Sequence, residues 1–376
     1  MKITLIAPTY LPARRANTIQ VMKMAQALTE LGHLTQVTIP GRQPEGLDWA
    51  ALAQQYGLRS RFSLLWLPAR PKLQRYDYGL AAVWQARRWQ ANLVYTRLPQ
   101  AAALASISGL ATIYELHDLP QGRGGPRLLR WFLRGRGMKR LVTISQALAH
   151  DLKLHYPEIE RQSALCVAPD GVDLERYTDL PAPVEARRRL GLPQHGFTAG
   201  YTGHLYPGRG RELLLQMAGM LPDLDFLLVG GEQNAQAELQ AAIDAARLQN
   251  VYLAGFVPNA DLPLYQAACE ALLMPYQRRV AGSSGGDIAA YLSPMKLFEY
   301  LASRRAILSS DLPVLREVLD SENAILLPPD EPLAWAQALH RLRADEDLRS
   351  RLAVQAGETA QRYTWRRRAE KILAAI

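Results

Sequence analysis

The chain has 376 residues, 48% of them hydrophobic and 21% charged, and 44 Lys and Arg residues outnumber 35 Asp and Glu residues. This length and composition predict two or three folded domains and exclude wholesale disorder. The only two cysteines, Cys166 and Cys269, lie far apart, which excludes a disulfide scaffold and a cysteine-based zinc site. The net charge of +9 favours an anionic partner: nucleic acid, an acidic membrane surface or a phosphorylated small molecule.

The apolar segments predict a cytoplasmic protein. The first apolar run, Ile3–Ala7, stops at Pro8 and is too short for a secretory signal. No stretch approaches the roughly 18 apolar residues that a membrane-spanning helix needs. The low cysteine content is also typical of a reducing compartment.

Strand-like and helix-like segments alternate from the first residues onward. Ile3–Ala7 is predicted to be a strand, Asn17 can cap the helix that follows, and Leu34–Ile39 is the next strand. A strand, helix and strand within about 40 residues form a βαβ unit, which implies a parallel sheet. Further short apolar runs predict strands at residues 64–67, 93–96, 112–116, 141–145 and 165–168.

The alternation restarts after Gly196. Pro181, Pro183 and Pro193 cluster just before this restart, so we place a domain boundary there. The second series predicts strands at 197–202, 225–229, 251–254, 271–274 and 306–309, with helices at 212–221, 232–248, 262–270, 294–304, 345–363 and 365–376. We therefore predict an α/β protein of two Rossmann-like, doubly wound domains that face a central cleft, with ligands at the carboxyl ends of the strands.

A series of short motifs follows in a specific order. They are Ala7-Pro8, Gly32-His33, His117, Ile144-Ser145, Asp170-Gly171-Val172-Asp173, Tyr201-Thr202-Gly203-His204, the segment from Ser293 to Ala302, and Ser310-Asp311-Leu312-Pro313. In this order the chain resembles, over nearly its whole length, the retaining glycosyltransferases of family 4, also called group 1.

The resemblance implies the GT-B fold and a division of labour between domains. Residues 1–188 would be the Rossmann-like domain that binds the acceptor, and residues 189–358 the one that binds a nucleoside diphosphate sugar. Residues 359–376 would form a helix that crosses back to the first domain.

Glu299 is the first candidate site residue. Its helix is apolar on most sides, so the carboxylate should be half-buried and need partners. The resemblance implies that Glu299 holds the two ribose hydroxyls of the nucleotide. The alternative is an i,i+3 ion pair with Lys296, which contributes only a few tenths of a kcal/mol.

The start of the same helix is a candidate diphosphate site. Ser293 is predicted to be the N-cap and Pro294 the first helical residue, so the helix would present its N-terminal N–H groups to an anion. The donor-binding residues expected here are Ser293, Met295, Lys296 and Leu297, and the glycine-rich stretch 281–287 could close over the donor. The chain departs from the family in having Tyr291 where a second glutamate is usual, and Asp287 is a candidate substitute.

The segment 203–211 follows a strand, is rich in glycine and arginine, and precedes a helix, which is typical of anion-binding turns. The resemblance implies that Gly203, His204 and Arg209 contact the diphosphate, and that Arg209 neutralises the leaving group. The alternative is a solvated surface turn.

The remaining expectations rest on the resemblance or on position in a loop. His117 would face the donor sugar, and it is grouped with Arg209 and Glu299 as catalytic; the alternative is a structural histidine. Phe256 and Val257 would place their backbone against the base. Arg14, Arg15 and Asn17 would contact the acceptor, unless they form only an exposed basic loop.

The densest basic segment is Arg123–Arg140, where arginines alternate with Leu, Trp and Phe. A basic amphipathic helix suits peripheral contact with an anionic membrane on its cytoplasmic face. The alternative is a core-facing helix with a solvated cationic face. The three arginines 366–368 are expected to be exposed, and no nucleic-acid-binding module is visible.

These expectations combine into a function: transfer of a sugar, with retention, to an acceptor hydroxyl that is free or lipid-linked, as in glycan, glycolipid or envelope polysaccharide synthesis. We expect no metal and no cofactor other than the nucleotide-sugar co-substrate, because no carboxylates have metal-ligand spacing. The alternatives are another GT-B nucleotide-sugar enzyme, namely an epimerase or a sugar-phosphate synthase, and a catalytically degenerate nucleotide-sugar-binding protein.

Overall fold

A computed structural model of the chain describes residues 1–162, 164–282 and 286–376 and divides them into two compact units. Unit 1 is Met1–Asp170 together with Trp365–Ile376, and unit 2 is Gly171–Thr364. The division therefore comes 18 residues before the boundary drawn between 188 and 189. Residues 171–188 belong to unit 2, and they bond to it: the Tyr177 hydroxyl donates to Gln266 Oε1 at 3.0 Å.

In unit 1 the described residues form a seven-stranded parallel sheet in the order β3-β2-β1-β4-β5-β6-β7. Its elements are β1 Lys2–Ile6, α1 Ala16–Glu30, β2 Leu34–Pro40, α2 Trp49–Tyr56, β3 Ser63–Leu67, α3 Tyr76–Arg88, β4 Leu93–Thr96, α4 Pro99–Ile107, β5 Thr112–Leu116, α5 Gly125–Arg134, β6 Met138–Thr143, α6 Gln146–His155, β7 Leu165–Val167 and α14 Trp365–Leu373.

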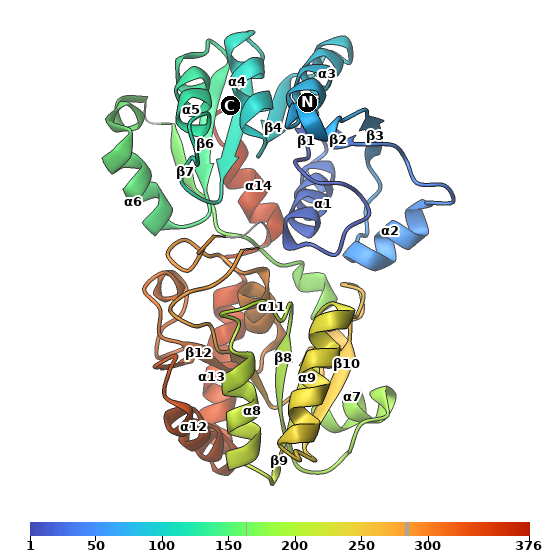
Figure 1. Cartoon of the computed structure of the whole chain (residues 1–376), viewed down its shortest axis with the longest axis vertical. Helices are drawn as coiled ribbons and strands as arrows, with labels where there is room; N and C mark the ends of the chain where they lie inside the picture. Colours follow the sequence, from blue (N-terminus) through green and yellow to red (C-terminus); the bar gives the residue numbers. More distant parts are fainter. Residues whose placement is uncertain (163, 283–285) are drawn as a thin grey trace. The chain divides into compact units, whose positions relative to one another are not determined.

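Helices cover the unit 1 sheet in two groups. Helices α3, α4 and α5 pack one after another, and the last helix, α14, lies beside α1 (Figure 1). The core between α3, α4 and the sheet includes Ile6, Tyr78, Val94, Leu98 and Ala101, all buried. The C-terminal segment thus folds as a part of unit 1.

In unit 2 the described residues form a six-stranded parallel sheet in the order β10-β9-β8-β11-β12-β13. Its elements are α7 Pro183–Leu190, β8 Phe197–Thr202, α8 Arg211–Met220, β9 Leu224–Val229, α9 Gln233–Ala245, β10 Val251–Gly255, α10 Leu262–Ala267, β11 Ala271–Met274, α11 Met295–Ser303, β12 Ala306–Ser310, β13 Ile325–Leu327, α12 Pro332–Ala344 and α13 Glu346–Ala360.

The position of β8 decides where unit 2 can bind a ligand. β8 pairs with β9 on one side and with β11 on the other, so the chain order reverses across it. In doubly wound sheets, a crevice for ligands opens at such a point, beyond the carboxyl ends of the strands. Large core residues, among them Phe226, Met217 and Trp335, hold the helices against this sheet.

The structure corrects the expected start of the first helix. α1 begins at Ala16, with Arg15 at the N-cap and no side-chain cap, so Asn17 lies inside the helix and does not cap it.

The proline-rich segment at the predicted domain boundary contains a helix, α7, that was not predicted. Pro183 occupies its first turn, where a missing N–H costs nothing. Arg187 of this helix is fully buried and donates from Nη1 to Glu270 and to the Ala268 carbonyl, each at 2.9 Å.

Candidate functional site

Loops that follow four neighbouring strands meet at one edge of the unit 2 sheet. They are residues 203–210 after β8, 230–231 after β9, 256–259 after β10 and 275–277 after β11. Their backbones are bonded together: the Gln277 amide donates to the Gly208 carbonyl at 2.9 Å and the Gly230 amide to the Gly255 carbonyl at 2.6 Å. The loops therefore form one connected surface, which we call the strand-end surface.

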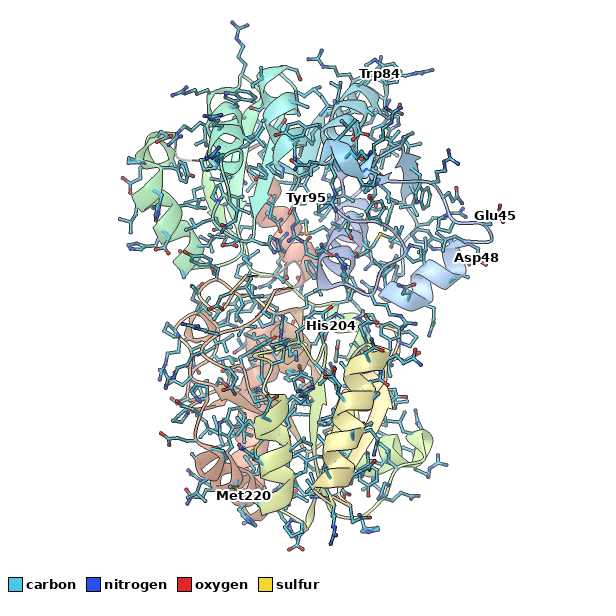
Figure 2. All side chains as sticks on the ribbon, viewed as in Figure 1. Glu45, Asp48, Trp84, Tyr95, His204 and Met220 are labelled. Carbon is cyan, nitrogen blue, oxygen red and sulfur yellow. The ribbon has the colours of Figure 1, made fainter. Side chains whose placement is uncertain are left out.

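Arg209 holds a fixed position on the strand-end surface. Its Nη1 donates to the Tyr276 hydroxyl at 2.7 Å, and its guanidinium lies 5.0 Å from the centre of that ring. Its Nε is buried and has no hydrogen-bond partner among the described residues. In the same loop, the ring of His204 (labelled in Figure 2) stacks on Tyr206 at 4.8 Å and 4°. Arg209 thus brings a cation with spare donors to this surface.

Glu299, in the middle of α11, is 8% exposed. Its Oε1 accepts from the Asn259 amide at 3.3 Å and its Oε2 from the Gln266 amide at 3.5 Å. Among the described residues it forms no ion pair, so the alternative considered for Glu299, an i,i+3 pair with Lys296, is not made. A carboxylate can accept about four hydrogen bonds, and these two are long, so Glu299 keeps capacity for further donors.

Two side chains that the sequence analysis did not single out hold Glu299. The Asn259 amide oxygen accepts from Arg176 at 2.8 Å, which fixes the amide so that its nitrogen faces Glu299. Gln266 is fully buried and donates to Thr202 Oγ1 at 3.3 Å as well as to Glu299. The one signal in the sequence for the role of Gln266 in holding Glu299 was its position on the apolar face of the helix predicted at 262–270.

The start of α11 differs from the prediction. Met295 is the first helical residue, and Pro294 is the N-cap with an extended ψ of 128°, so Ser293 lies outside the helix and is not its N-cap. The Leu297 amide donates to the Pro294 carbonyl at 2.9 Å and is therefore not available to a ligand. The amides of Met295 and Lys296 are the first-turn donors that remain.

The segment before α11 is described only in part. Residues 283–285 of the predicted glycine-rich closing loop lie outside the described residues. Asp287 Oδ1 accepts from the Val280 amide at 2.9 Å and the Ala289 amide at 3.0 Å, which lowers the pKa of Asp287. Its carboxylate thus shapes the local turn.

Phe256 and Val257 directly follow β10, as predicted, and Val257 is buried.

In unit 1, the half-buried His117 adjoins a buried polar cluster at the end of β5. Its Nε2 lies 2.5 Å from Oε1 of Glu115, and the same oxygen accepts from Gln20 at 2.7 Å, while Glu115 Oε2 accepts from the Tyr95 hydroxyl. Arg368, on α14, lies 3.0 Å from Glu115 and is buried. Arg366 and Arg367 are exposed, as expected, but Arg368 is not, because it lies on the face of α14 that packs against the core.

The cluster sets the protonation of His117. Burial lowers the pKa of His117 to about 4, and the nearby Arg97 guanidinium adds to this effect against the opposing pull of Glu115. Burial by itself would raise the pKa of Glu115, but Arg368 and His117 lower it overall. His117 is therefore neutral at pH 7 and donates from Nε2 to an ionised carboxylate. Its Nδ1 is then a hydrogen-bond acceptor.

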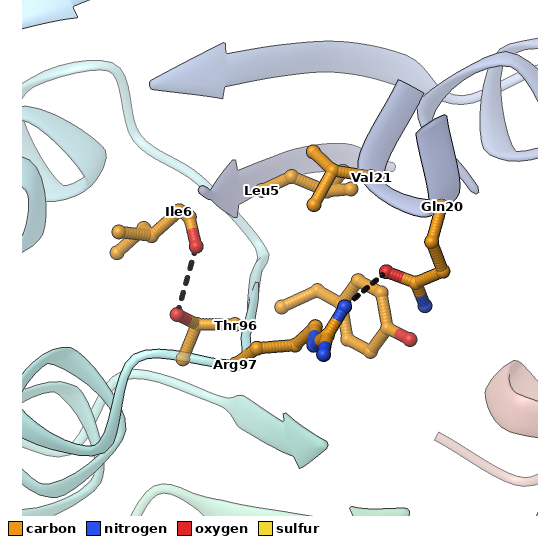
Figure 3. A pocket seen from close by; sticks show the side chains of 7 residues that line it. Leu5, Ile6, Gln20, Val21, Thr96 and Arg97 are labelled. Carbon is orange, nitrogen blue, oxygen red and sulfur yellow. Dashed lines mark hydrogen bonds between the residues drawn. The ribbon is translucent and has the colours of Figure 1, made fainter. Parts of the chain in front are cut away.

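A small cavity lies beside this cluster, lined by residues of β1, α1 and β4 and by Arg97 (Figure 3). Arg97 Nη1 donates to Gln20 Oε1 at 3.2 Å, which links the cavity wall to Glu115. Of the loop residues expected to contact an acceptor, Arg14 and Arg15 are exposed and Asn17 is half-buried.

The basic segment Arg123–Arg140 contains α5, whose residues Leu128, Leu129, Phe132 and Leu133 are buried. Arg140 donates to the carbonyls of Lys371, Ile372 and Ala374 at 2.5–2.9 Å, so it caps the end of α14. The apolar face of α5 thus packs against the core, which is what the alternative to membrane contact predicted for it. Within the described part of the chain, no helix is long and apolar enough to cross a membrane.

Two family models match the chain. The model described as Glycosyltransferase Family 4 matches residues 18–176, and the one described as Glycosyl transferases group 1 matches residues 196–345. The two matches fall one in each series of strands, and together they cover most of the chain.

Similar proteins carry related names. The 2-deoxystreptamine glucosyltransferase of Streptomyces kanamyceticus is 28% identical, over 73% of this chain and 80% of its own length. The phosphatidyl-myo-inositol mannosyltransferase of Mycolicibacterium smegmatis is 23% identical over 97% and 90%. A D-inositol 3-phosphate glycosyltransferase of Corynebacterium diphtheriae is 29% identical over 62% of this chain, and the match spans 54% of that protein.

Solved structures share the fold. Anabaena HepE, crystallised with UDP and glucose, superposes with a TM-score of 0.75 at 19% identity, and the match covers all of both chains. A sucrose-phosphate synthase from Thermosynechococcus elongatus gives 0.76 at 17% identity, over 99% of this chain and 97% of its own. With both family models in chain order and two Rossmann-like units in the structure, the chain belongs to family 4 of the GT-B glycosyltransferases.

Proposed function

We propose that the protein is a retaining glycosyltransferase that moves a sugar from a nucleoside diphosphate sugar to an acceptor hydroxyl. The observation that carries the proposal is Glu299, a buried carboxylate with long hydrogen bonds at the strand-end surface of unit 2. A ribose offers two neighbouring O–H donors, which suit one carboxylate whose own partners are only two neutral amides. Asn259 and Gln266 would hold Glu299 in place for this contact.

The leaving diphosphate would bind where positive charge is concentrated. Arg209 offers its unpartnered Nε as a donor. The amides of Met295 and Lys296, in the first turn of α11, are two further N–H donors. Negative charge grows on the diphosphate as the sugar–oxygen bond breaks, so donors fixed in advance stabilise the transition state more than the ground state.

Retention follows from the side of attack. The acceptor hydroxyl forms its bond to the anomeric carbon on the face from which the diphosphate leaves, and the departing phosphate oxygen takes the hydroxyl proton. In this scheme His117 is not the base. Neutral His117 accepts a hydrogen bond from a sugar hydroxyl at Nδ1, with Glu115 holding the ring. The scheme assigns no step to a metal ion or resident cofactor.

The donor is tested first by a thermal-shift screen of UDP, GDP, ADP and TDP and their sugars, since a ligand that binds only the folded chain raises its melting temperature. The reaction of the selected donor with candidate inositol, aminocyclitol and lipid-linked acceptors is then followed by NMR. We expect nucleoside diphosphate release matched by a new glycoside with the anomeric configuration of the donor.

The other outcomes of this experiment identify the alternatives. An inverted glycoside refutes retention, and an epimerised free sugar indicates an epimerase. A sugar phosphate as acceptor indicates a sugar-phosphate synthase. Binding without turnover on any acceptor supports the degenerate binding protein.

We also propose peripheral contact with an anionic membrane, through α3 next to the basic segment Arg123–Arg140. Tyr76, Leu80 and Trp84 follow one another at i, i+4 and i+8 and are all exposed. The Arg88 guanidinium lies 5.5 Å from the Trp84 ring centre, and a Cβ on Gly124 would lie 3.9 Å from the Tyr76 hydroxyl. An aromatic stripe flanked by arginines matches the chemistry of a negatively charged lipid surface.

Co-sedimentation with vesicles tests this contact. The chain should pellet with vesicles that contain anionic lipid, less so at high salt, and not with purely zwitterionic vesicles. Replacing both Leu80 and Trp84 by Ser should weaken binding, whereas Val354→Ser, at an exposed apolar position of α13, should not. Equal pelleting with both lipid compositions would refute the proposal.

A further inference from the structure

Lys296 is a buried cation that the structure leaves without a hydrogen bond. It is the second residue of α11 and is 8% exposed, and its Nζ has no hydrogen-bond partner among the described residues. Nζ lies 3.7 Å from the ring centre of Tyr201 and 5.5 Å from that of Tyr276. A buried ammonium that faces only ring electrons keeps most of its desolvation cost uncompensated.

The Lys296 side chain reaches the strand-end surface through a gap that only glycine leaves open. Gly203, the first residue after β8, has a φ of +135°, and a Cβ there would lie 2.8 Å from Nζ and 2.9 Å from Cε of Lys296. The ammonium therefore lies against the start of the loop that also carries Arg209. Two cations and the first-turn amides of α11 thus gather in one region of unit 2.

The charged and titratable groups around Nζ do not neutralise it. Tyr201 comes from β8, Tyr276 from the segment after β11, Arg209 from the loop after β8, and Glu299 from α11 itself. Burial lowers the pKa of Lys296 well below its usual range, the Arg209 guanidinium adds to this, and Glu299 opposes it. These surroundings favour the neutral amine more than water does, and an anion placed beside Nζ would shift the balance back towards the ammonium.

We propose that Lys296 Nζ is a side-chain ligand of the donor diphosphate and forms a two-cation site with Arg209. The proposal rests on the proposed function, because it needs a nucleoside diphosphate on the strand-end surface. It assigns to the side chain a role beyond that of the Lys296 backbone amide. A consequence is that the amine takes up a proton from solvent when the diphosphate binds, so donor binding is coupled to proton uptake.

Calorimetry with UDP, GDP, ADP and TDP tests this inference. Each titration is repeated between about pH 7 and 9 in two buffers of different ionisation enthalpy, because the difference in heat counts the protons taken up. For the diphosphate that binds, we expect net proton uptake at the alkaline end in the wild type. In Lys296→Met this uptake should disappear and the affinity should fall about 10- to 100-fold, as for the loss of a hydrogen bond to a charged group.

Arg278→Met is the matched control, because Arg278 is exposed and pairs with Asp330 in the same unit. It removes one positive charge without touching the buried amine, so affinity and proton uptake should stay close to wild type. Unchanged affinity and uptake in Lys296→Met would overturn the inference while leaving the proposed function standing. Failure of all four diphosphates to bind the wild type would overturn both. The uptake in the wild type needs no variant, so a misfolded Lys296→Met cannot hide the answer.

Discussion

Arg368 ties the last helix of the chain to the centre of the unit 1 sheet, and its replacement by Met should be strongly destabilising. Its Nη2 lies 3.0 Å from Glu115 Oε1, Nη1 donates to the Tyr95 hydroxyl at 3.1 Å and Nε to the Pro169 carbonyl at 2.9 Å. The side chains of Arg368 and Glu115 are 2% and 0% exposed. Removing the guanidinium leaves the Glu115 carboxylate buried with only neutral donors, such as Gln20 and Tyr95, around it.

The magnitude follows from the burial. Breaking a fully buried ion pair by removing one partner costs about 3–5 kcal/mol, because the remaining charge is uncompensated. Expressed as local opening of α14, that cost corresponds to a rise of about 100- to 4,000-fold in hydrogen exchange. Arg366→Met is the control: Arg366 is exposed on the same helix and pairs with Glu370 at 3.2 Å, which contributes at most about 0.5 kcal/mol.

Hydrogen exchange by mass spectrometry, with peptides from α14 and from β8, measures the effect in each unit separately. Arg368→Met should lose protection in α14 and leave β8 unchanged. Adding Glu115→Gln should restore much of the loss, because the orphaned charge is then gone. Protection in Arg368→Met equal to that in Arg366→Met would refute the reasoning. A double variant as unstable as the single one would show that Arg368 acts by packing.

Three further predictions follow from the same contacts. Gly203→Ala should lower nucleoside diphosphate affinity in calorimetry, because its Cβ displaces Lys296, whereas Gly219→Ala, whose Cβ would only contact Leu248 at 3.7 Å, should not. His117 has a folded-state pKa of about 4 against an ordinary 6.5, so the unfolded chain binds more protons between these values. The free energy of unfolding, from denaturant titrations, should therefore fall as pH drops from 6.5 towards 4, and less steeply in His117→Asn. Arg140→Ala should cost about 1–2 kcal/mol, read as faster exchange in α14, because three carbonyls lose their donor; unchanged exchange would contradict this.

The sequence predicted the strands well because most are short apolar runs bounded by Gly, Pro or Asp. The runs at 93–96, 112–116, 197–202 and 271–274 coincide with β4, β5, β8 and β11. Helix ends were less certain, since Asn17 and Ser293 both resemble N-caps while the structure starts each helix one residue after Arg15 or Pro294. A cap depends on the φ and ψ of one residue, which neighbours in space decide.

Contacts between residues distant in the chain could not be predicted. Arg368 and Glu115 are far apart in the sequence, and the run of three arginines around Arg368 looked like a solvated surface. Lys296 and Glu299 looked like an i,i+3 pair, but each side chain faces neighbours from other elements, Tyr201 in one case and Asn259 in the other. Spacing along the chain identified the candidate site residues, but the residues that contact them depend on how the helices pack against the sheet.

The central claim, that Glu299 holds a ribose, is tested most directly by a cycle of two ligands and two proteins. The wild type and Glu299→Gln are titrated with the nucleoside diphosphate selected by the screen and with its 2′-deoxy form, and Glu238→Gln, an exposed position of the same unit, is the control. In the wild type and the control, loss of the 2′-hydroxyl should weaken binding about 10- to 100-fold, as expected for a hydrogen bond to a charged group. In Glu299→Gln the two ligands should bind with nearly equal affinity. A ribose preference as large in Glu299→Gln as in the wild type would contradict the claim.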